Sequence, residues 1–254
     1  MQTLFTGEKV PLICVPMTAV SKEELQRQLH TLIKLQPDVI EWRADFFPDV
    51  IETSEVIETI QYIKETTDIP LLFTVRSERE GGESIPLDDA DIMALLQIVC
   101  ESTNVDMIDY EVMNERNYVE LIRYATRNNN IELLLSYHHF SETPSNNELL
   151  RIGAKMEFFG ADVAKIAVMP NNRTDVNRLL IVTEQLDQLL RIPVITMSMG
   201  ELGILSRVIG WAFGSQLTFA VGVGSSAPGQ VPIKQLREAI QTFQAITPGE
   251  LGLL

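Results

Sequence analysis

Cysteine and positive charge are both scarce in this sequence, and each shortage excludes a class of protein. The only cysteines among the 254 residues are Cys14 and Cys100, and their spacing fits neither a disulfide framework nor a zinc knuckle. Basic residues number 20 against 35 acidic ones, and the formal net charge of -15 argues against nucleic acid or an anionic membrane as a partner. Any cluster of arginines is therefore notable, because an anionic ligand would otherwise meet a repelling surface.

Long hydrophobic runs are absent as well. No segment reaches the length of a membrane-spanning helix, and residues 1–10 lack the basic and apolar regions of a secretory signal. These absences, together with the isolated cysteines, predict a cytoplasmic protein. The chain is 45% hydrophobic and long enough to enclose one large core, so we expect a single domain over residues 1–254.

Short apolar runs alternate with longer stretches of helical periodicity along the chain. The predicted strands are Leu12–Met17, Val39–Asp45, Pro70–Ser77, Met107–Val112, Ile131–Phe140, Val163–Pro170, Pro193–Gly200 and Leu217–Val223. Helices are expected to begin near Ser21, Ser54, Leu87, Asn114, Asn146, Thr174, Glu201 and Ile233, the first with a capping box of Ser21 and Glu24. Strict alternation predicts parallel strands that close into a (β/α)8 TIM barrel, with an open doubly wound sheet as the alternative.

Polar residues gather near the C-terminal ends of the predicted strands, where this fold places its catalytic groups. They are Glu41, Arg43, Asp45, Arg76, Glu80, Asp109, Glu111, His138, His139 and Lys165. We therefore expect an active site at this end of the barrel.

Lys165 is the most distinctive of these residues, because the strand around it is otherwise almost entirely apolar. At the mouth of the barrel interior its amine would be desolvated and able to attack a carbonyl group, which predicts a Schiff base with a ketone. The alternative is a structural lysine paired with Asp109 or Glu111, and the residue alone does not decide between the two.

His138 lies on the preceding strand, beside His139. Consecutive strand residues point to opposite faces, so the two histidines cannot both enter one site. An imine on Lys165 would acidify the neighbouring carbon, and His138 would be a suitable base to remove that proton. Glu80, in a loop closed by two glycines, could orient or tune the histidine, although a solvated loop acid is the alternative.

Three arginines, Arg43, Arg76 and Arg207, follow closely on strand ends. Recognition of a substrate carboxylate and pairing with neighbouring acidic residues are both expected uses, with one arginine left for the ligand. The last strand leads into Gly222–Gln230, a glycine- and serine-rich stretch that could cradle an anion or form a lid, and whose spacing is not a dinucleotide fingerprint. Met197 and Met199 would form an apolar wall on one face of their strand, more typical of core packing.

Taken together, these segments closely resemble type I 3-dehydroquinate dehydratases over nearly the whole chain. The motifs that carry the resemblance are Glu41-Trp-Arg-Ala-Asp45, Thr74-Val-Arg76 with Glu80-Gly-Gly82, Asp109-Tyr-Glu111, Ser136-Tyr-His138, Ala164-Lys-Ile166, Met197-Ser-Met-Gly200 with Ser206-Arg207, and Ser226-Ala-Pro-Gly-Gln230.

The resemblance implies syn dehydration of 3-dehydroquinate to 3-dehydroshikimate in the shikimate pathway, by a cytoplasmic homodimer without metal or cofactor. Lys165 would form an imine with the C3 ketone, His138 would take the C2 proton and return one to the C1 hydroxyl, and Glu80 would hold the imidazole. Arg207 would bind the substrate carboxylate. The other implied substrate-binding residues are Glu41, Arg43, Arg76, Ser226 and Gln230.

One position departs from the family pattern: the residue after the catalytic histidine is usually Asp or Asn, and here it is His139. Two other functions stay open on the residues alone. A class I aldolase would share Lys165 but cleave a carbon–carbon bond, commonly in a phosphorylated substrate. A catalytically silent barrel could only bind a sugar acid, although the presence of both Lys165 and His138 argues against that.

Overall fold

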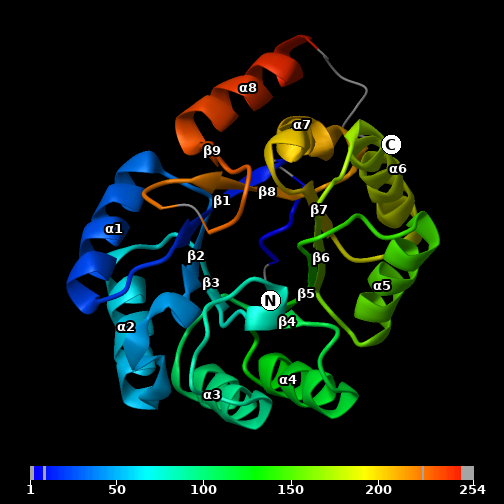
Figure 1. The fold of residues 1–254 in the computed structure, drawn as a ribbon. Coiled ribbons are helices and arrows are strands. Elements are labelled where there is room, and N and C mark those ends of the chain that lie inside the picture. Colours follow the sequence, from blue (N-terminus) through cyan, green and yellow to red (C-terminus); the bar gives the residue numbers. More distant parts are fainter. Residues whose placement is uncertain (1–2, 8–9, 225, 247–254) are drawn as a thin grey trace.

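The computed structural model describes residues 3–7, 10–224 and 226–246. Within these residues, eight strands run parallel around a common axis and the helices lie outside them (Figure 1). The strands are β1 (Leu12–Met17), β2 (Val39–Arg43), β3 (Leu71–Thr74), β4 (Met107–Glu111), β5 (Glu132–His139), β6 (Val163–Val168), β7 (Val194–Ser198) and β8 (Leu217–Val221). A short strand, β9 (Val231–Pro232), pairs with β8.

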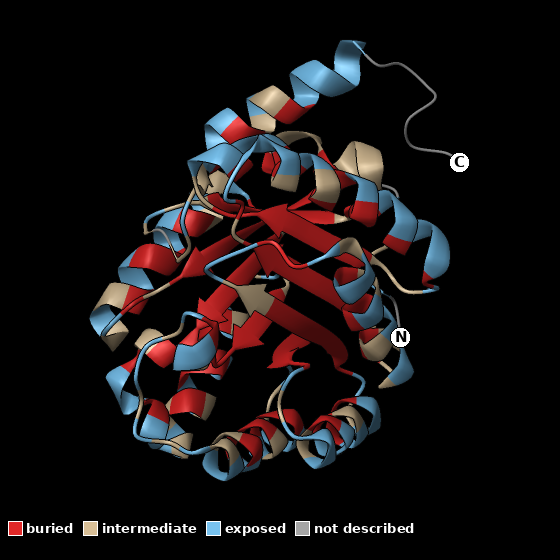
Figure 2. Ribbon diagram, turned by 45° about the vertical axis from the view of Figure 1, so that its right-hand side comes forward, coloured by how far each residue is buried: buried red, intermediate tan, exposed pale blue. Residues whose placement is uncertain are grey.

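The helices cover the outside of the strands, with buried inner faces and exposed outer faces (Figure 2). They are α1 (Lys22–Leu35), α2 (Thr53–Thr66), α3 (Asp89–Ser102), α4 (Arg116–Asn128), α5 (Asn146–Phe158), α6 (Arg173–Leu189), α7 (Ile204–Ile209) and α8 (Ile233–Ile246). Single turns of 3-10 helix occur at η1 (Ala44–Phe46), η2 (Pro48–Ile51), η3 (Glu78–Glu80), η4 (Glu201–Gly203) and η5 (Gly210–Phe213).

Strand order confirms the (β/α)8 barrel and excludes the open doubly wound sheet. From β1 to β7 each strand pairs with the next one along the chain, and β1 also pairs with β8. The remaining seam, between β7 and β8, is joined by a parallel bridge of Val194 with Ser215 and by a 2.8 Å bond from Gln216 N to Val194 O. The curved sheet therefore returns to its own first strand.

Sequence patterns located the eight strands of the barrel but not β9, and they extended most of the eight too far. The strand predicted over Val39–Asp45 ends at Arg43, because Ala44–Phe46 turns into the 3-10 helix η1. At the start of α1, Ser21 accepts a bond from Glu24 N as predicted, but the Glu24 carboxylate accepts from Val20 N and not from Ser21 N. The capping box expected there is therefore incomplete.

Two apolar clusters fill the molecule, one on each side of the strands. The larger cluster lies between the strands and the helices. The smaller one fills the barrel interior with residues such as Leu72, Met107 and Val163, against which Leu4 and Phe5 of the N-terminal segment pack. Each of these interior residues stands near the beginning of its strand, so the C-terminal half of the interior is left for other side chains.

Candidate active site

Strand alternation brings polar side chains to one end of the barrel interior. On β4 the inward position changes from Met107 to Asp109 and then Glu111, and on β6 it changes from Val163 to Lys165. The register places Glu111 beside Ser136 on β5, and Ser136 beside Lys165 on β6, so polar positions of three neighbouring strands lie side by side. The apolar cluster thus forms the floor of a polar site at the C-terminal end.

Lys165 is buried within this site, with 4% of its surface exposed. Its Nζ lies 2.9 Å from Asp109 Oδ2 and 3.7 Å from Glu41 Oε1, and it stands 4.5 Å from the centre of the Phe219 ring. Thr74 donates a 3.1 Å hydrogen bond to Glu41 and so helps to fix that carboxylate. The amine therefore faces the interior, and it makes the pairing with Asp109 that the sequence offered as the structural alternative.

Arg76 is the centre of a buried ionic network. Its guanidinium pairs with Asp109 Oδ1 at 2.7 Å and Glu111 Oε1 at 3.3 Å, and it donates a 2.9 Å bond to Ser136 Oγ. Burial alone would raise the pKa of Asp109, but the charges of Arg76 and Lys165 outweigh it and hold that pKa far below its usual value. Asp109 consequently stays ionised and holds both cations in place.

His138 and Glu80 form a second pair, with 9% and 8% of their side-chain surfaces exposed. Glu80 Oε2 lies 2.8 Å from His138 Nδ1 and also accepts a 3.0 Å bond from the backbone N–H of the same residue. Burial raises the pKa of Glu80 to about 8, whereas burial and the nearby charges of Arg76 and Lys165 lower the pKa of His138 well below its usual value. The imidazole is therefore neutral, and an Nδ1–H bonded to Glu80 leaves Nε2 able to accept a proton.

His139 has no place in the pocket, in agreement with the prediction that only one of the two adjacent histidines could enter it. Its Nδ1 accepts a 3.2 Å bond from Glu142 N, and its ring stands 6.2 Å from that of Tyr137. His138 lines the pocket and His139 does not.

Arg43 and Arg207 differ in their partners. Arg43 makes a two-pronged ion pair with Asp45, at 2.8 Å and 2.7 Å. Arg207, on α7, is equally buried but has no carboxylate within ion-pairing distance among the described residues. Its contacts are Met197 Sδ, Phe219 O and Pro228 O, and burial lowers its pKa to about 10. It is the arginine that can receive an anionic ligand, which the sequence predicted for one of the three.

A loop after β8 contributes Ser226, Ala227 and Gln230 to the lining of the pocket. Ser226 and Gln230 bond to each other twice, from Ser226 N to Gln230 Oε1 at 3.1 Å and from Gln230 Nε2 to Ser226 Oγ at 3.2 Å. The loop is held to the segment that follows β7 by a 3.1 Å bond from Gly200 N to Pro228 O. Ser225, within the stretch proposed as an anion cradle, lies outside the described residues.

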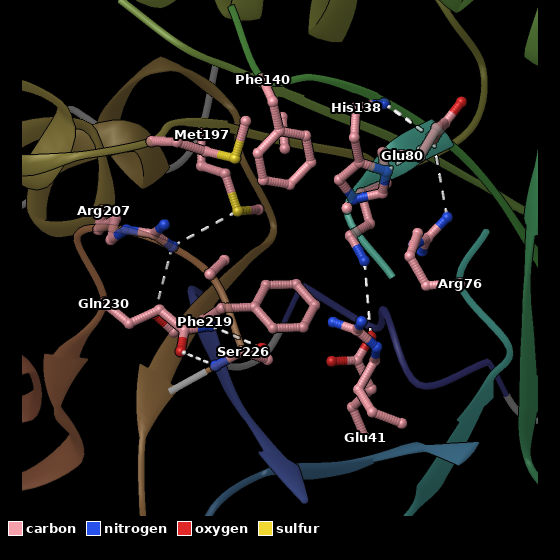
Figure 3. Close-up of a pocket in the computed structure, with 16 residues that line it drawn as sticks. Glu41, Arg76, Glu80, His138, Phe140, Met197, Arg207, Phe219, Ser226 and Gln230 are labelled. Carbon is pink, nitrogen blue, oxygen red and sulfur yellow. Dashed lines mark hydrogen bonds and ion pairs between the residues drawn. The ribbon is translucent and has the colours of Figure 1, made fainter. Parts of the chain in front are cut away.

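One pocket brings together every residue to which the sequence analysis assigned a catalytic or substrate-binding role. These are Glu41, Arg43, Arg76, Glu80, His138, Lys165, Arg207, Ser226 and Gln230. Figure 3 shows Arg207 on one side of this pocket and His138, Glu80 and Arg76 on the other. A buried amine, a neutral imidazole and an arginine without a carboxylate partner therefore face a common space.

Comparison with known proteins assigns nearly the whole chain to one family. Residues 13–247 match the sequence model of the family described as type I 3-dehydroquinase. The chain belongs to this family.

Relatives and solved structures of the type I 3-dehydroquinase family match over nearly full length. A 3-dehydroquinate dehydratase of Albidiferax ferrireducens is 48% identical over 92% of this chain and 89% of its own. The crystal structure of 3-dehydroquinate dehydratase from Geobacillus kaustophilus has 41% identity and a TM-score of 0.91, covering 93% of this chain and 92% of that one. A type I enzyme from Clostridium difficile, crystallised with covalently modified comenic acid, has 35% identity and a TM-score of 0.91 over 95% of both chains.

Membership in the type I 3-dehydroquinase family makes the chain a carbon–oxygen lyase of the hydro-lyase class, and neither an aldolase nor a silent binding barrel. Among the described residues, no helix is long and apolar enough to cross a membrane. The same residues contain no cluster of three or more His, Cys, Asp or Glu side chains that could hold a metal ion.

Several pocket residues of this dehydroquinase were not proposed from the sequence. They are Gly81, Phe140, Ala167, Met197, Met199, Phe219 and Ala227. Met197 and Met199 do belong to the interior core, as expected, but they also form the pocket wall beside Arg207. Strand alternation would have found both aromatic residues, because Phe219 faces inward on β8 and Phe140 shares the face of His138 in the predicted strand Ile131–Phe140.

Proposed function

We propose that this enzyme dehydrates 3-dehydroquinate to 3-dehydroshikimate through a Schiff base on Lys165. The family supports the reaction, and one observation in the structure supports the mechanism. Lys165 and His138 line the same pocket, and Arg207 lies across it with no carboxylate partner among the described residues. A ketone, an acidic carbon beside it and a carboxylate on one small ring can meet these three groups at once.

The first half of the reaction attaches the substrate. Lys165, as the neutral amine, adds to the C3 carbonyl, and loss of the carbonyl oxygen as water leaves a C=N bond. Asp109, which holds Nζ at 2.9 Å, aims the amine into the pocket. The iminium that results withdraws electrons from C2 and makes its proton removable.

The second half eliminates water. His138 Nε2 takes the C2 proton, and the electrons of that C–H bond form an enamine. The enamine then expels the C1 hydroxyl, which leaves as water with the proton that His138 returns, and hydrolysis of the new imine frees 3-dehydroshikimate and Lys165. Because one imidazole serves both steps, proton and hydroxyl leave from the same face, as a syn elimination requires.

The remaining pocket residues bind the substrate and exclude water in this proposal. Arg207 takes the carboxylate at C1, since its fork of N–H donors is not committed to a protein carboxylate. Glu80 holds the imidazole in the required tautomer. The residues assigned to the ring hydroxyls and to lid closure are Glu41, Arg43, Arg76, Ser226 and Gln230.

Reduction with borohydride tests the mechanism directly. The wild-type enzyme is mixed with 3-dehydroquinate, treated with borohydride and digested, and the mass of the peptide that carries Lys165 is measured. We expect that peptide to gain the mass of the reduced substrate or product, and Lys165→Ala to gain nothing and to lose turnover. Turnover by Lys165→Ala, or an adduct on another lysine, would contradict the proposal.

We also propose that the enzyme serves the shikimate pathway in the cytoplasm, as a homodimer of one catalytic domain over residues 1–254. Resemblance to the family supports these assignments. Light scattering after size exclusion tests the dimer, and complementation of a strain that needs aromatic amino acids tests the pathway.

A further inference from the structure

Glu80 is carried by an irregular loop, and its position therefore depends on what holds that loop. Residues 76–83, called the Glu80 loop here, leave β3 and contain the single turn η3. Their internal bonds are few and short in range, such as Gly82 N to Ser77 O at 2.8 Å. Such a loop is not rigid on its own account, yet it must hold a carboxylate within 2.8 Å of an imidazole.

Asp45 binds both ends of this loop. Its Oδ1 accepts a 3.3 Å bond from Arg76 N, and its Oδ2 accepts a 3.1 Å bond from Glu83 N. The two ends approach so closely that a Cβ on Gly82 would lie 2.0 Å from Arg76 O. One buried carboxylate therefore closes the base of the loop.

A carboxylate is the only side chain that suits this position. Four N–H groups converge on Asp45, two from the backbone of the Glu80 loop and two from the Arg43 side chain. Each oxygen accepts one bond of each kind, and an amide would present N–H donors where one oxygen now accepts. Asp45 is 3% exposed, so water would not replace the lost bonds.

Glu111 supports the same loop from the neighbouring strand. Its two oxygens accept bonds from Ser77 N at 2.9 Å and from Ser77 Oγ at 2.7 Å. Asp45 and Glu111 thus bind the loop at three backbone N–H groups, and these flank the turn η3 that carries Glu80.

We propose that Asp45 is a positioning residue, which fixes both ends of the Glu80 loop and thereby holds Glu80 against His138. Asp45 does not line the pocket and would not touch the substrate. The alternative is that Asp45 serves only as the partner of Arg43. The kinetic consequence rests on the proposed function, whereas the consequence for the loop does not.

Asp45→Asn tests the proposal, with Asp49→Asn as the control, because Asp49 is an exposed aspartate on the following 3-10 helix. Without substrate, we expect faster hydrogen exchange in residues 77–83 and loss of the His138 Nδ1 hydrogen bond in nitrogen NMR spectra, with no change in the control. Unchanged exchange and spectra would overturn the proposal, even if the enzyme proved to act on another substrate.

The kinetic test separates the loop from Arg43. We expect Asp45→Asn to lower kcat by roughly 10- to 100-fold, the scale of a misplaced catalytic group, while borohydride still traps substrate on Lys165. The same loss should appear when Asp45→Asn is added to Arg43→Met. If Asp45→Asn has no effect in that background, Asp45 acts only through Arg43 and the proposal is wrong.

Ser77→Ala provides a second variant should Asp45→Asn fail to fold. It removes the hydroxyl bond to Glu111 but keeps every carboxylate and every backbone bond. A smaller increase in exchange over residues 77–83, with a smaller fall in kcat and an unchanged KM, would support a loop held from outside. No change in either measurement would contradict it.

Discussion

The two sides of the pocket differ in how their charged side chains are paired. On one side, Arg76, Asp109, Glu111 and Lys165 form an ionic network in which every charge has an opposite charge within 4 Å. On the other side, Arg207 stands against Met197 and the Phe219 backbone, with no such partner among the described residues. The charges of the first side are therefore paired within the protein, whereas the charge of Arg207 can be paired by an anionic ligand.

This difference separates preorganisation from recognition. An ionic network whose charges are already paired changes little when the ketone group of the substrate, which is uncharged, comes close to it. Such a network can hold an amine and an imidazole in fixed positions. An arginine buried without a carboxylate has a cost in the empty enzyme that a substrate carboxylate can offset. We therefore expect substitutions on the ionic side to affect chemistry and stability, and those at Arg207 to affect binding.

The largest effect is expected at the point where the ionic side performs chemistry. His138→Ala should lower kcat by roughly 10²- to 10⁴-fold, because the group that moves the C2 proton is lost. Imine formation should survive, since Lys165 is unchanged, and borohydride trapping measured by mass spectrometry checks it. Equal losses in His138→Ala and His139→Ala would contradict the assignment of one histidine to the pocket.

Arg76→Met should disrupt the ionic network and lower the stability of the fold. The substitution leaves Asp109, Glu111 and Glu80 buried without their shared cation, and removal of one partner from a buried ion pair destabilises a protein by about 3–5 kcal/mol. Chemical denaturation measures the change. Arg79→Met, which removes an exposed arginine of the Glu80 loop, is the matched control and should change stability little. Equal losses in the two variants would refute the contrast.

Arg207→Met should have the opposite profile. Binding of the substrate carboxylate should weaken by roughly 10- to 150-fold, corresponding to about 1.5–3 kcal/mol for a charged hydrogen-bonded contact. Folding stability should be unchanged or greater, because a buried charge without a carboxylate partner is replaced by an apolar side chain. Titration with the carboxylated product and with its methyl ester checks this, since the variant should lose its preference for the acid.

Glu80→Gln should move the acid limb of the pH profile to lower pH. In the wild type, burial raises the pKa of Glu80 to about 8, so the pair of Glu80 and His138 takes up a proton as the pH falls through that region. Gln cannot take up a proton, which leaves His138, whose pKa is lowered. We expect the acid limb of kcat/KM to shift down by at least about one pH unit. An acid limb that stayed in place would show that proton uptake by Glu80 does not set it.

How far the sequence predicts this molecule depends on the range of the interactions concerned. Strand alternation is local, and it correctly predicted that only one of His138 and His139 could enter the pocket, but it did not by itself decide which one. The strand ends were less well predicted. The sequence pattern extends the second strand to Asp45, whereas in the structure that strand ends at Arg43 and Asp45 lies in the 3-10 helix η1.

The sequence could not predict which side chains pair over long distances along the chain. It showed three arginines and several carboxylates at strand ends, but which arginine stays without a carboxylate depends on which side chains converge in space. Arg43 finds Asp45 two residues away, whereas Arg76 finds Glu111 on the next strand and Arg207 finds none among the described residues. For the same reason, the sequence could not predict the hydrogen bonds that Asp45 accepts from both ends of the Glu80 loop.

The smallest effect is expected at His139. Its Nδ1 accepts the bond from Glu142 N, which is a contact that an Asn side-chain oxygen can also make at a turn. His139→Asn should therefore keep kcat, KM and stability close to wild type, within the roughly 0.5 kcal/mol usual for surface changes. Steady-state kinetics across the pH range check this, with His139→Ala as the variant that loses the bond. If His139→Asn alone moved the acid limb, this histidine would tune the catalytic pair from outside the pocket.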